Sequence, residues 1–265
     1  MIPKEWAQLY KKLLSTLAHR PTSSYIGAMA RVLRQRFYIP HCCALCDSHN
    51  RHRICQRCIT QFFHSPHYYC SVCALPLLHS ALLCGECLRH TPEFDRAYSP
   101  FLYEKPLSNL VINFKEQRDF FAGKAMADVF YRYVQAHMIQ QHQPLPDLIT
   151  AIPLHWIKQG NRGFNQSAFF ANDLSHKMNI TLFTGVERIE SSPPQKSLDR
   201  KRRLGSMRNS FIVTQPLNNE HVVIVDDVMT TGATVSALTM ALKKAGAGEV
   251  SVWVLARVPK MLNTQ

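Results

Sequence analysis

The chain has 265 residues, of which 46% are hydrophobic, and carries a formal charge of +13 from 31 basic and 18 acidic residues. This length accommodates one α/β domain and a small appended module, with enough apolar residues for a packed core. No window approaches the roughly 18 to 20 apolar residues of a membrane-spanning helix, and Met1–Arg20 lacks the pattern of a secretory signal. We therefore expect a cytoplasmic protein without a transmembrane segment.

The first 37 residues form a basic, amphipathic extension. Apolar side chains recur there at roughly helical spacing, at Trp6, Tyr10, Leu13, Leu14 and Leu17. Residues 1–41 carry seven basic residues and one acid. A helix lying on a membrane surface, which would place the protein peripherally at the inner membrane, is one interpretation. A partner-docking helix and a true start at Met29, leaving residues 1–28 untranslated, are the alternatives. We assign the extension no function.

Residues 38–92 contain all nine cysteines, and eight of them form four CxxC pairs. The pairs are Cys43 with Cys46, Cys55 with Cys58, Cys70 with Cys73, and Cys84 with Cys87. Each pair can present two thiolates to one tetrahedral ion, so four pairs predict two structural zinc sites with four cysteine ligands each. Disulfides are the competing interpretation, but a reducing compartment disfavours them. The simplest scheme joins neighbouring pairs as a double zinc ribbon, while an interleaved scheme remains open.

The remainder, residues 93–265, alternates strand and helix patterns. Strands are expected at 96–103, 147–152, 186–189, 222–225 and 250–255, and helices at 107–114, 120–142, 166–178 and from about 233 to 245. Lys115 ends the first of these helices, where it either complements the helix dipole or contacts a ligand. The alternation predicts an α/β fold with a doubly wound parallel sheet. The polar, basic segment 191–205 is a candidate lid over the active site.

The most informative stretch is 222–234, which reads VVIVDDVMTTGAT. Its β-branched run suits a buried parallel strand, and Asp226 and Asp227 follow at the carboxyl end, where such sheets bind ligands. A ribose diol with Mg²⁺ nearby suits this acidic pair. The small residues Thr230, Thr231, Gly232, Ala233 and Thr234 then let backbone N–H groups close around a phosphate at a helix N-terminus. A P-loop nucleotide site is excluded because no GxxxxGK[ST] precedes the strand.

Residues 222–234 resemble the 5-phosphoribosyl-1-pyrophosphate (PRPP) signature of type I phosphoribosyltransferases. A second stretch, IPLHWIKQGNRGFNQ at 152–166, is similar to the pyrophosphate loop of the ComF family. Arg188, Pro194, Gln195, Leu198, Arg203 and Phe211 match that family's flexible-loop spacing, although Ser206 stands where asparagine is usual. The resemblance covers roughly residues 38–258. It implies a type I phosphoribosyltransferase fold with an N-terminal double zinc ribbon, as in the ComF/GntX family of bacterial proteins for DNA uptake and DNA use.

The resemblance also implies roles for individual residues. Asp226 and Asp227 would hold the ribose hydroxyls and residues 230–234 the 5-phosphate. Arg162 and Gly163 would face the pyrophosphate, while Mg²⁺ bridges pyrophosphate and ribose. Lys196 and Arg203 are expected either to contact the leaving group or to form a solvated charge run.

Two functions follow from these patterns. The first is a phosphoribosyltransferase-family protein that binds PRPP with Mg²⁺ and acts with the DNA-uptake machinery or in the utilisation of external DNA. The alternative is a non-catalytic module that senses PRPP or a nucleotide and binds single-stranded DNA through its basic surface. A purely structural zinc-ribbon adaptor would leave the complete phosphate loop without a purpose. No segment for recognising an acceptor nucleobase can be identified.

Overall fold

The computed structural model describes residues 42–154, 160, 163–189 and 210–259. The chain divides into two compact units, Met1–Pro40 and His41–Gln265, and everything below concerns the second. The predicted extension 1–37 therefore lies outside the described residues. Among the described residues, no helix combines the length and the apolar character needed to span a membrane.

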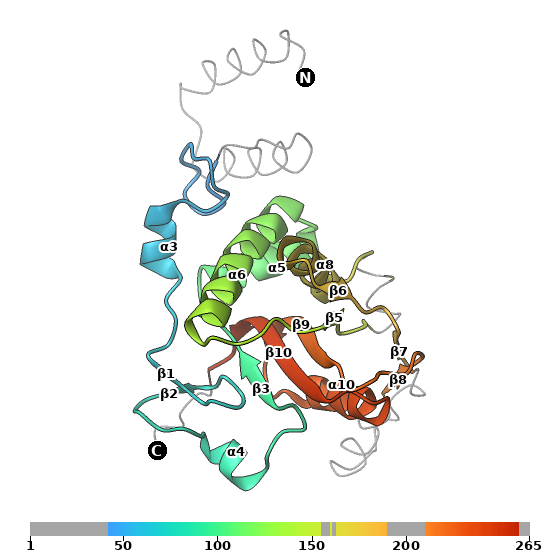
Figure 1. Ribbon diagram of the computed structural model, residues 1–265. Helices are drawn as coiled ribbons and strands as arrows, with labels where there is room; N and C mark the ends of the chain where they lie inside the picture. Colours follow the sequence, from blue (N-terminus) through green and yellow to red (C-terminus); the bar gives the residue numbers. More distant parts are fainter. Residues whose placement is uncertain (1–41, 155–159, 161–162, 190–209, 260–265) are drawn as a thin grey trace, which may run out of the picture. The chain divides into compact units, whose positions relative to one another are not determined.

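The centre of the second unit is a parallel sheet in the order β3-β10-β9-β5-β6, with β4 also paired to β10. Its strands are β3 (Arg96–Tyr98), β4 (Phe101–Leu102), β5 (Leu148–Ala151), β6 (Thr181–Leu182), β9 (His221–Met229) and β10 (Glu249–Arg257). The long, apolar β9 and β10 lie side by side at its middle (Figure 1). The predicted parallel sheet is therefore confirmed.

Helices cover both faces of this sheet. They are α5 (Leu107–Gln117), α6 (Phe120–Gln140), α8 (Gln166–Met178) and α10 (Ala233–Lys244). In Figure 1, α5, α6 and α8 gather on one side of β9 and β10, while α10 lies on the other. Successive strand residues point to opposite faces, so Val223 and Val225 pack into the first core, whereas Val222 and Ile224 pack into the second. The sheet is doubly wound, as predicted.

The predicted element bounds differ in detail from those observed. The strand expected at 96–103 is broken into β3 and β4 by Ser99 and Pro100, and the expected helix 107–114 runs on to Gln117. The helix predicted at 166–178 coincides with α8. A two-stranded ribbon of β7 (Val186–Arg188) and β8 (Phe211–Val213) stands apart from the main sheet, and its second strand was missed.

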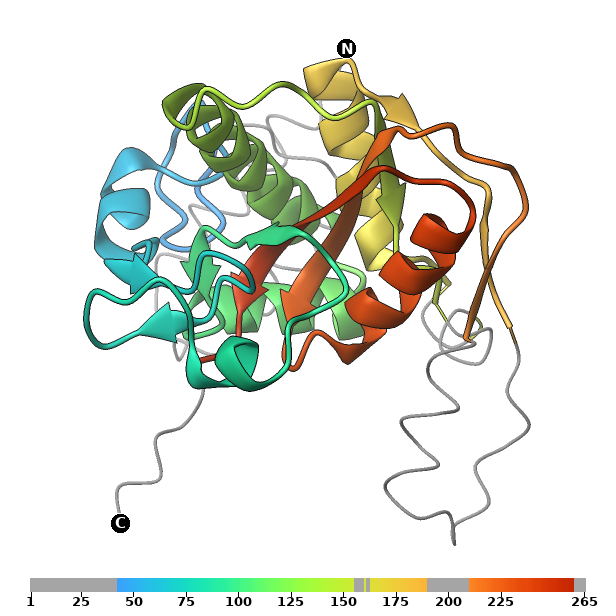
Figure 2. The same cartoon turned by 60° about the horizontal axis from the view of Figure 1, so that its bottom comes forward.

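The cysteine segment contributes α3 (Gln56–Phe62), β1 (Tyr68–Tyr69), β2 (Pro76–Leu77) and α4 (Gly85–Arg89). Cys43, Cys55 and Cys58 belong to the same hydrophobic core as α5, α6 and α8, whereas the other four clustered cysteines belong to the core beneath α10. Figure 2 shows the second half of the segment beside β10 and α10. Each half therefore adds buried surface to a different face of the sheet.

Candidate functional site

Asp226 and Asp227 lie within β9, close to its carboxyl end. The strand continues to Met229, which pairs with Arg257 of β10, so the acids precede the strand end rather than follow it. The strand predicted at 222–225 therefore runs on to Met229, because Val228 and Met229 still pair with β10. Asp227 is 7% exposed, and Asp226 is partly buried. Two adjacent carboxyl groups are thus held out of bulk solvent at the ligand-binding edge of the sheet.

Asp226 accepts two hydrogen bonds at Oδ1, from the hydroxyl of Ser167 at 2.6 Å and from the backbone N–H of Asp227 at 2.9 Å. The pKa of Asp226 is raised from 3.8 to about 7, chiefly by burial and then by the neighbouring charge of Asp227, while these hydrogen bonds and Lys115 oppose the rise. Near neutral pH this carboxyl group therefore passes between its neutral and charged forms. Ligands that need the carboxylate would bind better above this pKa.

Asp227 forms an ion pair with Lys115, whose side chain extends from the last turn of α5. The two side chains are 9% and 22% exposed. This ion pair is a third role for Lys115, and the helix-dipole and ligand roles considered from the sequence both stay predictions. Lys115 lies two residues before the end of α5, and its ammonium group reaches Asp227 near the carboxyl end of β9. One acid is therefore bound by a hydroxyl and the other by a cation.

The loop after β9 leads directly into the N-terminus of α10, as the sequence predicted. Gly232 adopts φ +79°, a left-handed conformation at the N-cap of α10 that favours glycine. Thr230 and Thr231 are exposed, and the hydroxyl of Thr231 accepts from the N–H of Ala233 at 3.3 Å. The loop therefore presents hydroxyl groups and backbone N–H groups at the positive end of a 12-residue helix.

The second predicted loop connects β5 to α8. Asn165 caps α8 by accepting from Ala168 N–H at 3.2 Å, and its Nδ2 donates to the carbonyl of Ile152 at 2.9 Å. Gly163 has φ +77°, and a Cβ placed there would approach Nη2 of Arg118 to 3.2 Å. The glycine thus provides both the backbone conformation and the space for a guanidinium group. Arg162, Lys196 and Arg203 lie outside the described residues, so their predicted roles remain predictions.

The eight CxxC cysteines gather into two clusters in the neighbouring-pair scheme. One contains Cys43, Cys46, Cys55 and Cys58, and the other Cys70, Cys73, Cys84 and Cys87. Within each cluster the four sulfur atoms lie within 4.8 Å of one another. Cys55 and Cys84 also cap α3 and α4, accepting from the N–H groups of Cys58 and Cys87. Four convergent thiols suit a structural tetrahedral zinc ion.

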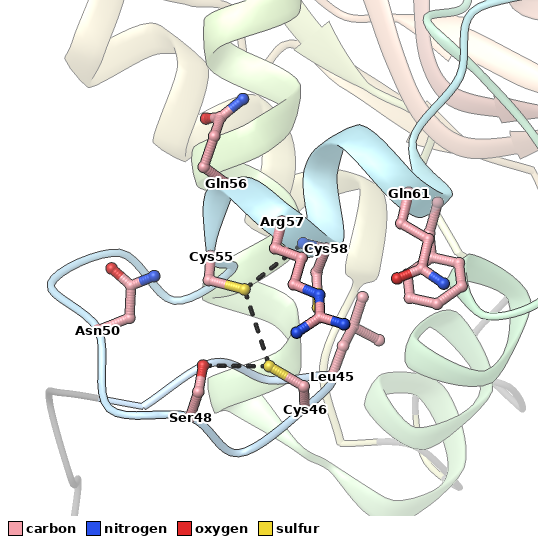
Figure 3. A pocket seen from close by; sticks show the side chains of 10 residues that line it. Leu45, Cys46, Ser48, Asn50, Cys55, Gln56, Arg57, Cys58 and Gln61 are labelled. Atoms are coloured by element: carbon pink, nitrogen blue, oxygen red, sulfur yellow. Dashed lines mark hydrogen bonds between the residues drawn. The ribbon is translucent and has the colours of Figure 1, made fainter.

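The first cluster is open on one side, where a cavity of about 680 Å³ adjoins it. Figure 3 shows Cys46 and Cys55 facing this space. The hydroxyl of Ser48 forms a hydrogen bond with the sulfur of Cys46 at 3.1 Å. Hydrogen bonds from Ser48 lower the pKa of the Cys46 thiol from 9.0 to about 6. The thiolate is the form that binds metal, whereas burial raises the pKa of the Cys58 thiol in the same cluster. None of the described residues in the loops before α8 and α10 lines this cavity.

A magnesium ion would meet different chemistry at Asp226 and Asp227. Mg²⁺ is usually held by one or two carboxylates together with substrate phosphates and water, so this acidic pair fits it. Among the described residues, clusters of three or more metal-binding side chains occur only at the two cysteine sites. The acidic pair therefore fits a metal that arrives with its phosphate ligand.

Two side chains of this site were missed by the sequence analysis, namely Ser167 and Arg118. Ser167 directly follows the RGFNQ run, so a hydroxyl in the first turn of α8 was the available signal. Arg118 follows α5 and has φ +54°, which places it over the second loop. Only the tertiary contact with Gly163 reveals Arg118, because 45 residues separate them in the sequence.

The doubly wound parallel sheet, with paired acids in β9 and a small-residue loop before α10, defines a type I phosphoribosyltransferase fold. A family model described as a phosphoribosyl transferase domain matches residues 165–262. Competence protein F of Haemophilus influenzae is 33% identical over 208 residues, covering 77% of this chain and 90% of that protein. The DNA utilization protein YhgH of Salmonella typhi is 35% identical over 189 residues, covering 71% and 83%. The chain belongs to the ComF family.

Competence protein ComFC of Streptococcus pneumoniae is a more distant relative, 27% identical over 157 residues and covering 59% of this chain and 66% of that protein. Among solved structures, a purine phosphoribosyltransferase from Pyrococcus horikoshii gives a TM-score of 0.32 at 18% identity, over 50% of this chain and 82% of its own. The family assignment therefore rests on the sequence relatives.

Proposed function

We propose that the protein binds PRPP together with Mg²⁺ at the carboxyl end of β9. The observation that carries this proposal is the arrangement of Asp226 and Asp227, each with a separate polar partner, directly before a threonine- and glycine-rich helix N-terminus. The acids would hold the ribose hydroxyls, and residues 230–234 would hold the 5-phosphate through their N–H and hydroxyl groups. Magnesium, when bound, would neutralise charge on the pyrophosphate.

The chain's own groups have distinct tasks in this proposal. The Ser167 hydroxyl and the Lys115 ammonium would orient the two carboxyl groups toward the diol and limit their mutual repulsion. Arg118, over Gly163, would add positive charge beside the loop that faces the pyrophosphate. Arg162, Lys196 and Arg203 are proposed to complete this contact to the leaving group. A site arranged in this way favours charge separation at the ribose C1.

Calorimetric titration of the zinc-loaded protein with PRPP tests the proposal. Binding is expected with magnesium present and should be much weaker in magnesium-free buffer; a chelator is avoided because it would also strip zinc. The double variant Asp226→Asn with Asp227→Asn should lose binding while keeping the circular dichroism spectrum of the wild type. Glu86→Gln, an exposed carboxyl group on α4, is the control. Equal affinity in wild type and double variant would overturn the proposal.

We further propose a role in the uptake or utilisation of external DNA, alongside the DNA-uptake machinery. This rests on the relatives named as competence and DNA utilization proteins. A strain lacking the protein is expected to lose transformation or growth on DNA, and the wild-type gene should restore it. Release of pyrophosphate from PRPP on adding DNA fragments or nucleobases would distinguish a transferase from a sensor.

A second candidate function, binding of single-stranded DNA, is supported by exposed aromatic rings on the cysteine segment. Phe62, Tyr68 and Tyr69 are 41%, 46% and 40% exposed, in a chain with a net charge of +13. Exposed rings near positive charge are the usual platform for unpaired bases. Affinity should fall with salt, with a logarithmic slope of about −0.7 for each phosphate neutralised.

Fluorescence anisotropy with a labelled oligothymidine tests this candidate. Tyr68→Ala with Tyr69→Ala should weaken binding about tenfold or more, since base stacking contributes roughly 1–3 kcal/mol per base. Leu82→Ala removes an 81% exposed apolar side chain from the same segment and should change little. Binding that is insensitive to salt, or equal losses in both variants, would contradict it.

A further inference from the structure

Arg257, the last residue of β10, connects three parts of the protein. It is 5% exposed. Its Nε donates to the carbonyl of Cys73 at 3.1 Å, and its Nη1 donates to the carbonyl of Met229 at 2.9 Å and to that of Thr230. One guanidinium group thus joins the second cysteine cluster, the end of β9 and the first residue of the phosphate loop.

The surroundings of Arg257 are uncommon for a buried charge. Buried arginines are normally paired with carboxylates, because removing a charge from water is costly. Within the described part of the chain, no carboxylate forms an ion pair with Arg257, and its hydrogen bonds there all go to backbone carbonyls. The backbone carbonyl groups accept hydrogen bonds from the guanidinium group but do not neutralise its positive charge. The guanidinium group of Arg257 therefore lies beside Met229 and Thr230 without a carboxylate partner among the described residues.

A residue that follows the second cysteine cluster in the sequence also lies against the loop after β9. Phe94, which follows α4, is buried, and its ring lies 3.6 Å from the position a Cβ would take on Gly232. The cluster is also tied to the sheet, because the N–H of Ala97 in β3 donates to the carbonyl of Val72 at 2.7 Å. Val72 and Cys73 belong to the same CxxC turn. A metal that fixes this turn would also fix the acceptor of Arg257.

We propose that Arg257 is a positioning residue that couples metal occupancy of the Cys70, Cys73, Cys84 and Cys87 cluster to the conformation of the phosphate loop. The cluster fits zinc, since its four sulfur atoms converge. Arg257 holds the loop through the Met229 and Thr230 carbonyls and supplies positive charge for a phosphate group. The second cysteine cluster is then part of the phosphate site, whereas the first is not. The phosphate-binding part of this inference rests on the proposed function.

Amide hydrogen exchange of residues 229–236 in the zinc-loaded full chain tests the coupling without any ligand. Arg257→Gln and Arg257→Lys should both raise exchange there about tenfold, since hydrogen bonds from a charged donor are lost. Lysine keeps the charge but cannot span three carbonyls, so it decides the result if the glutamine variant fails to fold. Arg96→Gln, which removes a guanidinium group paired with Glu249, should leave these amides unchanged.

Metal removal from one cluster at a time provides the matched comparison. Cys84→Ser should raise exchange at residues 229–236 by more than its loss of unfolding free energy accounts for, whereas Cys46→Ser, in the first cluster, should raise it only by the amount that its loss of unfolding free energy accounts for. Arg257→Gln should also speed the release of one zinc ion of two to a colorimetric chelator. Unchanged exchange in both Arg257 variants, or equal effects of Cys46→Ser and Cys84→Ser, would overturn the inference.

Titration with PRPP separates this inference from the proposed function. If the wild type binds PRPP, Arg257→Lys should weaken binding about tenfold, and undiminished binding would overturn the coupling to the phosphate site. If the wild type does not bind PRPP, the proposed function fails, while the exchange and zinc-release measurements still decide whether Arg257 couples the cluster to the loop.

Discussion

The hydroxyl of Ser167 donates a 2.6 Å hydrogen bond to Oδ1 of Asp226. Ser167 lies in the first turn of α8, after the loop that carries Gly163, while Asp226 lies in β9, before the loop that carries Gly232. The bond therefore joins α8 to β9, beside the two loops that are proposed to bind the ligand. It also lowers the pKa of Asp226, against the burial that raises it to about 7.

Replacing Ser167 by alanine should shift the pH dependence of PRPP binding. Without this hydrogen bond the pKa of Asp226 rises further, so less carboxylate is present at pH 7 and the affinity should fall about three- to tenfold. Calorimetric titrations between pH 6 and about pH 9 should show the affinity recovering at the alkaline end. Ser175→Ala, on the same helix but bonded to the carbonyl of Ile180, is the control. An identical profile in wild type and Ser167→Ala would contradict this.

Asp226→Asn should make the ligand-free protein more stable at neutral and alkaline pH. The folded protein keeps the Asp226 proton up to about pH 7, whereas an unfolded chain loses it near 3.8. The free energy of unfolding of the wild type therefore falls between these values as pH rises. Asparagine cannot ionise, so the variant avoids this loss in free energy of unfolding, which is on the order of 2–4 kcal/mol above pH 7.

Urea unfolding at several pH values measures this effect. The free energies of unfolding of the wild type and of Asp226→Asn should converge below about pH 4, because residue 226 is then largely uncharged in both proteins. Glu86→Gln, which changes an exposed carboxyl group, should follow the wild type at every pH. A constant difference between Asp226→Asn and the wild type at all pH values would be the opposite result.

Lys115→Met should destabilise the protein by about 3 kcal/mol, because it leaves Asp227 without its counter-charge in a 9% exposed position. Millimolar magnesium should restore part of the stability in the variant, since a cation at the acidic pair replaces the lost charge. Lys243→Met breaks the ion pair with Asp95 at 3.1 Å, where the side chains are 37% and 42% exposed. That change should cost less than about 1 kcal/mol. Calorimetric unfolding with and without magnesium distinguishes the two sites.

Removal of zinc should destabilise the whole unit 41–265 rather than the cysteine segment alone. Three cysteines of the first cluster, Cys43, Cys55 and Cys58, pack in the core under α5, α6 and α8, and all four of the second pack in the core under α10. We expect two zinc ions per chain by elemental analysis. We also expect a single unfolding transition, lowered by at least about 10 °C on chelation.

Cys42→Ser is the control for this measurement, because Cys42 belongs to neither cluster. It should keep both zinc ions and the transition temperature. Two separate transitions, with the upper one unaffected by chelation, would instead indicate an independent zinc module and support the predicted boundary at residues 92 and 93.

The sequence was sufficient for the fold class and for the local structure of the segment that is proposed to bind phosphate. A β-branched run, two acids and a glycine-containing loop before an amphipathic stretch are local patterns, and β9, the loop and α10 follow from them. The CxxC spacing likewise predicted two four-cysteine sites, because each pair spans only four residues. Local backbone preferences and side-chain periodicity act over such short distances, so a single segment contains enough information.

Other features depended on contacts between distant segments. The sequence left open which CxxC pairs associate, and the sulfur positions show that neighbours do. It also did not reveal the ion pair between Lys115 and Asp227, which lie on α5 and β9. Ser167 lies 59 residues from Asp226, and Arg257 lies 184 residues from Cys73. These partners are selected by strand order and helix packing, whose energies depend on burial in the folded protein rather than on local sequence.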